Sequence, residues 1–396
     1  MRDKHWTGER VGRRFRRVFS LALLTILIGT LVALAVAYRS WVDAQARAAI
    51  VISSVLEAPV LTPVAEAVSG EPRFTDASIA GNPALIARPA GDGPWPAVFI
   101  VNGTVPEGRR LPEVRRLAEG LARAGYLVLV PDLPGLTEDE ITPETVDETV
   151  DVAREASERP DVEGGEAALV GVSTGATLAL LASERASLEG RISVVAGVAP
   201  YADIRTVVNV ATTGHYRDGK EFRRHEADPF LSYAIARSLV AALPPGEDRR
   251  TLFNELGGVD REDPNPLAGL RSRPTEDLGP KAKSVVELLA NEEVGRFDAL
   301  YESLPEGVCA DLRKLSPLAG TGRLHAPVEI ATGPRDRYFP VSESFELERI
   351  APGRRVTVTR ALDHAKLDFS LEDAPAFAAF DGFVVRALRE ARLDGK

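Results

Sequence analysis

The stretch Ala167-Ala-Leu-Val-Gly-Val-Ser-Thr-Gly-Ala-Thr-Leu-Ala-Leu-Leu-Ala182 decides how this chain folds. It begins as a short apolar segment typical of a strand, passes through Gly171-x-Ser173-x-Gly175, and continues as an apolar run that favours a helix. The two glycines permit a sharp turn that lifts the serine hydroxyl above the edge of a sheet. The same five residues can also occur in an ordinary turn that happens to hold a serine. The prediction of a raised serine therefore depends on the strand and the helix on either side of the motif.

Segments typical of strands and helices alternate on both sides of this stretch. Such alternation predicts an α/β fold, in which helices cover both faces of a mostly parallel sheet. Thr142 is a candidate N-cap and Gly125 a candidate helix end. The strands are expected at 96–101, 126–131, 167–172, 192–198, 327–332 and 355–359, and the helices at 110–124, 143–158 and 377–392.

Over about residues 72–202 and 315–392 the chain resembles the α/β-hydrolase superfamily. The turn around Ser173 and the order of strands near it carry this resemblance. Members of the superfamily place their catalytic residues in the chain order serine, acid, histidine, with the acid after a late strand and the histidine after the last one.

The resemblance extends to two later segments. Gly333-Pro-Arg-Asp336-Arg-Tyr-Phe-Pro340 is similar to the acid loop of the superfamily, and Ala361-Leu-Asp-His364 follows the last expected strand. The resemblance therefore implies a catalytic triad of Ser173, Asp336 and His364.

The same resemblance implies an oxyanion hole, formed by the backbone N–H groups of Thr104 and Thr174. Many members carry His-Gly where this chain has Asn102-Gly103. Because the donor is a backbone group, the substitution affects the orientation of the loop more than the chemistry.

Physical reasoning about the histidines favours the same base. A serine hydroxyl needs a neighbouring base to take its proton, and histidine has a pKa near the working pH. Only His364 follows a strand at the end where such sheets carry their chemistry. A loop histidine exposed to solvent is the alternative. The other histidines are His5, which precedes an apolar segment, His215 and His225 in an expected insertion, and His325 just before an expected strand.

Four aspartates compete for the role of the acid. Asp132 and Asp203 follow strands but lack the loop that surrounds Asp336, whereas Asp363 is the immediate neighbour of the histidine. Side chains of adjacent loop residues usually diverge. We therefore expect Asp336 to orient the base.

The N-terminus predicts a membrane anchor. Residues 18–38 contain no charge and no proline, and 21 residues of helix span about 30 Å, the thickness of the bilayer hydrocarbon. Residues 1–17 hold seven basic and two acidic side chains, a net charge of +5; the whole chain carries −10, so the remainder carries −15. By the positive-inside rule, the tail 1–17 stays in the cytoplasm and the body lies outside it.

A retained single-pass anchor in the cell membrane is favoured over a signal peptide. Cleavage near Ala37 would release a secreted protein, but the apolar run exceeds the usual length of a signal core. Residues 39–71 suit a stalk or an interfacial segment, followed by a hydrolase domain over 72–396.

More than a hundred residues separate the strands expected near 198 and 327, far more than one crossover requires. Amphipathic helices are expected at 230–243 and 281–304. The resemblance implies that this insertion, about 201–316, is a helical lid over the serine.

These observations favour a membrane-anchored serine hydrolase that acts on an ester, thioester or amide of a small or lipid-like acyl group. The alternatives are a hydrolase fold that binds a ligand without turnover, or an acyltransferase or peptidase on the same fold. The acidic body argues against a nucleic-acid partner. No Cys/His spacing indicates a metal site and no glycine-rich loop indicates a phosphate cofactor.

Overall fold

The computed structural model describes residues 28–30, 38–56, 63, 67, 69–319, 324, 326–350, 354–367 and 373–392. The chain divides into two units, 1–46 and 47–396. The tail 1–17 and most of the expected anchor 18–38 lie outside the described residues. Within the described ranges, no helix is both long enough and apolar enough to cross a membrane. Helix α2 (Arg39–Leu56) occupies the first part of the segment expected as a stalk.

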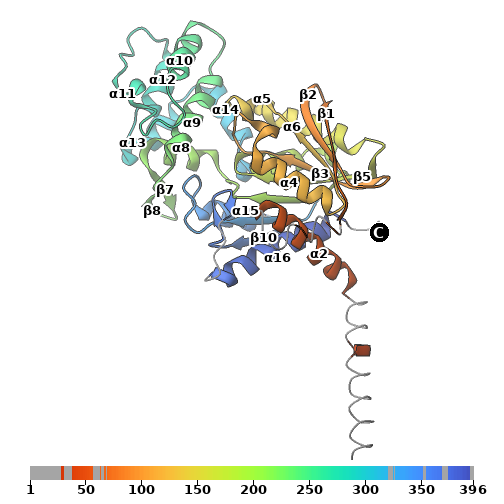
Figure 1. Cartoon of the computed structure of the whole chain (residues 1–396). Coiled ribbons are helices and arrows are strands. Elements are labelled where there is room, and N and C mark those ends of the chain that lie inside the picture. Colours follow the sequence, from red (N-terminus) through yellow and green to blue (C-terminus); the bar gives the residue numbers. More distant parts are fainter. Residues whose placement is uncertain are drawn as a thin grey trace, which may run out of the picture. The chain divides into compact units, whose positions relative to one another are not determined.

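A mixed sheet of eight strands forms the centre of the second unit (Figure 1). Its order is β1-β2-β4-β3-β5-β6-β9-β10, with the first two strands antiparallel and the six from β4 to β10 parallel. The mostly parallel sheet was expected, whereas β1 and β2 were not. The strands are β1 (Arg73–Ile79), β2 (Asn82–Arg88), β3 (Trp95–Val101), β4 (Leu127–Pro131), β5 (Val162–Val172), β6 (Ile192–Val198), β9 (Val328–Thr332) and β10 (Arg354–Val358).

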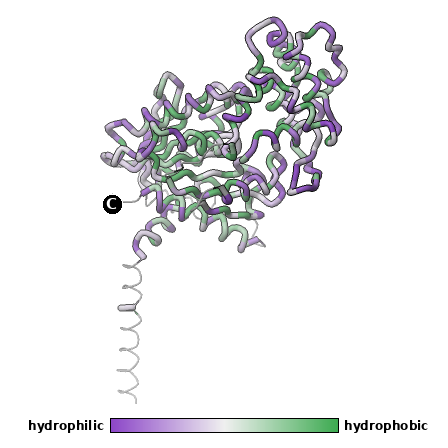
Figure 2. Tube along the Cα trace, turned by 180° about the vertical axis from the view of Figure 1, so that it is seen from behind, coloured by the Kyte–Doolittle hydropathy of each residue, from purple (hydrophilic) through white to green (hydrophobic). Residues whose placement is uncertain are grey.

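Helices cover both faces of this sheet, as expected. Val195 of β6 belongs to the main core cluster with residues of α6 (Pro143–Ser157) and α7 (Thr174–Ser183), whereas the next residue, Ala196, packs with Phe383 of α16 (Ala374–Glu390). Successive strand residues point to opposite faces, so α16 lies on one face and α6 and α7 on the other. Hydrophobic residues concentrate in the interior between these layers (Figure 2).

Local signals read from the sequence account for several element boundaries. Thr142 precedes α6 as its N-cap and forms a capping box with Thr145, which satisfies backbone N–H groups at the helix start. Helix α4 (Pro112–Arg123) ends just before Gly125, whose φ of 92° suits glycine.

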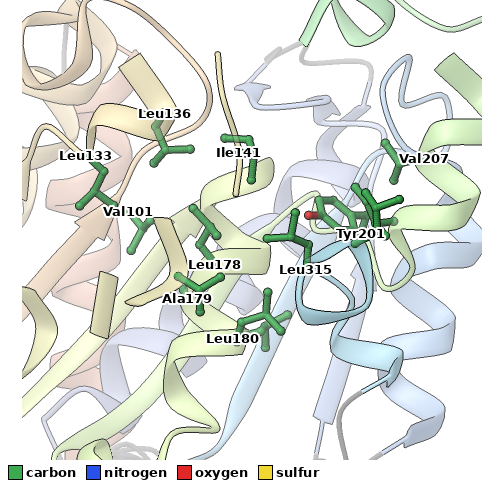
Figure 3. Packing of buried hydrophobic residues seen from close by; sticks show 14 of the residues in the cluster. Val101, Leu133, Leu136, Ile141, Leu178, Ala179, Leu180, Tyr201, Val207 and Leu315 are labelled. Atoms are coloured by element: carbon green, nitrogen blue, oxygen red, sulfur yellow. The ribbon is translucent and has the colours of Figure 1, made fainter. Parts of the chain in front are cut away.

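Between β6 and β9 lies the expected insertion, and it is mainly helical. Its core is continuous with that of the sheet: Tyr201, Val207 and Leu315 share one cluster with Leu178 and Leu180 of α7 (Figure 3). It contains α8 (Ile204–Thr213), the hairpin β7 (His215–Asp218) and β8 (Glu221–Arg224), α9 (Pro229–Ala241), α10 (Glu247–Gly257), α11 (Ala268–Ser272), α12 (Pro280–Leu289), α13 (Val294–Glu302) and α14 (Glu306–Lys314).

The single helix expected at 281–304 is wrong, because the structure breaks it into α12 and α13. The break follows from Asn291, whose buried amide donates to the carbonyl of Glu293 and accepts from its N–H. Such a local hydrogen bond between a side chain and the backbone competes with the backbone hydrogen bonds that would continue the helix.

Candidate active site

Ser173 occupies the sharp turn between β5 and α7, with φ 55° and ψ −129°. A positive φ at a residue other than glycine is strained and is maintained only by its surroundings. Here the Ser173 N–H donates to the carbonyl of Val198 at 2.7 Å. A Cβ on Gly171 would lie 2.3 Å from Ala176, and one on Gly175 would lie 2.0 Å from the carbonyl oxygen of Asn102. Only glycine fits at both positions, as the sequence motif predicts.

Asp336 and His364 meet at the ends of two adjacent strands, β9 and β10. The Nδ1 atom of His364 lies 2.7 Å from Oδ2 of Asp336, whose side chain is only 1% exposed. The other carboxylate oxygen accepts backbone N–H groups from Tyr338 and Phe339 at 2.7 and 3.0 Å. A carboxylate in this position favours the tautomer with the proton on Nδ1, which leaves Nε2 free to accept a proton.

The imidazole of His364 is held in place by more than its carboxylate. The ring of Tyr338 lies 4.2 Å from it between centroids, and the ring of Phe339 lies 5.8 Å away edge-on. A Cβ on Gly333 would lie 2.4 Å from the carbonyl oxygen of Leu362, so the acid loop and the histidine turn pack directly together. These contacts restrict the ring to one orientation.

The three residues of the expected triad follow β5, β9 and β10, which belong to one set of parallel strands. Their carboxyl ends therefore lie along the same edge of the sheet. No hydrogen bond joins the Ser173 hydroxyl to His364 in the described part of the chain. Catalytic bonds of this kind often form only when substrate is bound.

The competing candidates have other contacts. Asp132 pairs with Arg109, Asp203 caps α8 through the N–H of Arg205, and Asp363 is exposed. His215 and His225 belong to the β7–β8 region, as expected for the insertion. His5 and His325 lie outside the described residues.

Thr104, the expected oxyanion donor, lies in the loop that follows β3. Asn102 fixes this loop: its Oδ1 accepts the N–H of Gly103 at 2.9 Å, and its Nδ2 donates to the carbonyl of Gly108 at 3.2 Å. Within the described ranges, nothing accepts a hydrogen bond from the backbone N–H of Thr104 or of Thr174.

Sequence reasoning missed Glu343, whose side chain is buried in α15 (Val341–Ile350), the helix that follows the acid loop. Its Oε2 accepts the backbone N–H groups of Ala202 and Asp203 at 2.9 and 2.8 Å, so it ties the acid-loop helix to the start of the insertion. Burial raises the pKa of Glu343 to about 7. No local pattern distinguishes this glutamate from an exposed helical one, because its partners lie about 140 residues away.

Glu343 makes stability dependent on pH. Between its ordinary pKa of 4.5 and about 7, the unfolded chain loses the proton while the folded one keeps it, so stability falls as the pH rises through this range. Gln cannot ionise but can accept the same two N–H groups. We expect the melting temperature of Glu343→Gln, relative to wild type, to rise by several degrees from pH 5 to pH 7.5. A difference that stays constant with pH would contradict this linkage.

Within the described residues, no group of three or more His, Cys, Asp or Glu side chains is arranged to hold a metal ion. The backbone donors at Thr104 and Thr174, the buried Asp336–His364 pair and the serine turn lie on one edge of the sheet. Chemically, such an arrangement can activate a hydroxyl and stabilise an oxyanion.

A family model described as the alpha/beta hydrolase family matches residues 97–380. This range includes most of β3, the strands from β4 to β10, the insertion and every site residue described above. No curated protein sequence matches the chain.

Several solved structures are similar to the chain at low identity. EstE5 soaked with p-nitrophenyl butyrate is 16% identical, with a TM-score of 0.42, over 84% of this chain and 90% of that one. A 2-hydroxy-6-oxo-6-phenylhexa-2,4-dienoate hydrolase from Rhodococcus sp. strain RHA1 is 20% identical, with a TM-score of 0.43, over 80% and 99%. A membrane phospholipase A described as a bacterial virulence factor is 14% identical, with a TM-score of 0.40, over 94% and 99%. These likenesses are weak, and the family assignment rests on the match of the family model to residues 97–380.

Proposed function

Because this chain belongs to the alpha/beta hydrolase family, we propose that it is a serine hydrolase that cleaves an ester, thioester or amide through an acyl-enzyme. The hydrogen bond between His364 and the buried carboxylate of Asp336 is the observation that carries this proposal. A hydrolase fold that only binds a ligand has no need of an oriented imidazole and a strained serine at the same edge of the sheet.

In the proposed mechanism, the Ser173 hydroxyl attacks the acyl carbonyl while His364 Nε2 takes its proton. Asp336 stays ionised and stabilises the resulting imidazolium by accepting a hydrogen bond from its Nδ1–H. The negative carbonyl oxygen accepts the N–H groups of Thr104 and Thr174, and the second of these opens α7, whose dipole favours negative charge. His364 then returns its proton to the leaving group, and a water molecule repeats the sequence to release the acid.

The chemical test uses the full-length chain in detergent. A fluorophosphonate probe should label one serine covalently, and a panel of aryl esters of increasing acyl length should reveal turnover together with the preferred acyl group. A folded protein that neither reacts with the probe nor cleaves any ester would exclude the proposed chemistry.

We further propose that the hydrolase domain is anchored in the cell membrane by residues 18–38 and lies outside the cytoplasm. Support comes from the uncharged length of this segment and from the net charge of +5 over residues 1–17. Residues 28–30 of this segment, which the structure describes together with Tyr38, are helical. An acyl substrate in or near the membrane would fit this placement.

This topology predicts that the full-length protein resists alkaline extraction from membranes. Protease added to intact spheroplasts should digest the domain while a tag on residue 1 stays protected, because the positive-inside rule places that end in the cytoplasm. A cytoplasmic marker protein controls for leakage. Protection of the domain would reverse the orientation, and release by alkali would indicate cleavage near Ala37 or the absence of an anchor.

A further inference from the structure

The loop that carries Thr104 contacts a residue of the insertion. Arg261 follows α10, 157 positions further along the chain, and its Nη2 lies 3.4 Å from the carbonyl oxygen of Thr104. At this length the bond itself contributes little energy. Its importance lies in what holds the guanidinium there.

Arg261 is fixed by two other contacts. It binds Asp139 through two parallel hydrogen bonds, from Nε at 2.9 Å and from Nη2 at 2.8 Å. The Asp139 side chain is 6% exposed, and its backbone has a φ of 61°. The guanidinium also lies 4.4 Å from the ring centroid of Phe230 in α9. A bidentate pair with a stacked ring restricts both the position and the plane of the guanidinium.

The Thr104 N–H therefore lies between two hydrogen-bonded points of the backbone. On the chain side before it, Asn102 accepts the N–H of Gly103. On the side after it, Arg261 donates to the Thr104 carbonyl. A Cβ on Gly103 would lie 3.5 Å from Cβ of Ser173, which shows how close this short segment comes to the serine.

We propose that Arg261 is a positioning residue of the active site, which orients the Thr104 N–H toward the oxygen that becomes negative during attack by Ser173. The assignment rests on the function proposed above. It gives the insertion a part in the chemical step in addition to any part in selecting substrate. Oxyanion donors act by being held in place before the reaction, so a small rotation of the Thr104 peptide reduces the rate without weakening substrate binding.

The insertion supplies a matched control in Arg237 of α9. Arg237 pairs with Glu140 and donates to the carbonyl of Glu138 at 3.1 Å. It therefore contacts the residues on either side of Asp139. Its hydrogen bonds do not reach the Thr104 loop. Loss of Arg237 therefore reproduces the loss of an insertion–core ion pair without the loss of the contact under test.

The experiment compares Arg261→Met and Arg237→Met with wild type as full-length chains in detergent. For Arg261→Met we expect the fluorophosphonate labelling rate and kcat on a short aryl ester to fall by about 10-fold to 100-fold, less than for loss of a whole oxyanion donor. KM should stay within about twofold. The inhibition constant of a trifluoromethyl ketone, whose adduct carries an oxyanion, should rise by the same factor as kcat falls. Arg237→Met should lower the melting temperature and keep kcat within about twofold.

Equal loss of kcat in both variants, or full kcat in Arg261→Met, would overturn the assignment. If the Met variant does not fold, Arg261→Lys serves, because Lys can pair with Asp139 but lacks the planar fork that also reaches Thr104; full kcat in that variant would overturn the assignment as well. If the wild-type protein shows no turnover, or if its turnover does not depend on Ser173, the proposed function itself is refuted. The Arg261 variants cannot produce that result, because it is measured on the wild-type chain and on Ser173→Ala.

Discussion

Ser173→Ala should abolish both probe labelling and ester turnover while leaving the fold intact. In the proposed mechanism the hydroxyl forms the acyl-enzyme and no other group replaces it, so kcat should fall by about 10⁴-fold or more. The strained backbone of the turn is held by the Ser173 N–H and the neighbouring glycines, which the substitution keeps. Labelling of the intact protein followed by peptide mapping, with turnover on the best ester, provides the measurement.

Ser183 supplies the control for this experiment, because it lies at the other end of α7 and its hydroxyl donates to the Leu180 carbonyl of its own helix. Ser183→Ala should keep full activity. Turnover by Ser173→Ala at even a tenth of the wild-type rate would identify a different nucleophile.

Loss of the proposed base or of the proposed acid that orients it should have effects nearly as large. His364→Ala removes the proton acceptor, and Asp336→Asn presents an amide where the Nδ1 proton needs an acceptor, which favours the wrong tautomer. We expect kcat to fall by about 10³-fold to 10⁴-fold in each. Because the residues act together, the double variant should lose little more than either single one.

Steady-state kinetics and circular dichroism together test this second prediction. Asp363→Asn is the matched control, since this exposed carboxylate is the immediate neighbour of His364 in the chain. If Asp336→Asn retains most of its kcat while Asp363→Asn loses it, then Asp363 and not Asp336 acts as the acid.

The parts of the site that could be predicted from the sequence depend on short-range patterns. The turn at Ser173 needs two glycines within two residues, and the acid loop at Asp336 carries its glycine and proline within eight. Strand ends then place both at one edge of the sheet without further information. The pairing of Asp336 with His364 follows from the adjacency of β9 and β10, which consecutive parallel strands favour.

What could not be predicted depends on contacts between distant segments. Arg261 reaches Asp139 across 122 positions, and Glu343 reaches Ala202 across 141. In the sequence each is one charged residue among many, and charged residues are usually exposed. Strand β1 was missed for a different reason: it is exposed along most of its length, so it lacks the apolar run that marks the central strands.

The shared core of the insertion and the sheet has a consequence for substrate entry. A flap that opens on a hinge needs an interface that separates at little cost, but here Tyr201, Val207 and Leu315 are part of the same hydrophobic cluster as Leu178 beneath the serine turn. Swinging the whole insertion away would expose that cluster to water, at a cost comparable to unfolding. We therefore expect a substrate to reach Ser173 through small rearrangements of nearby loops and side chains, with the insertion staying fixed to the sheet.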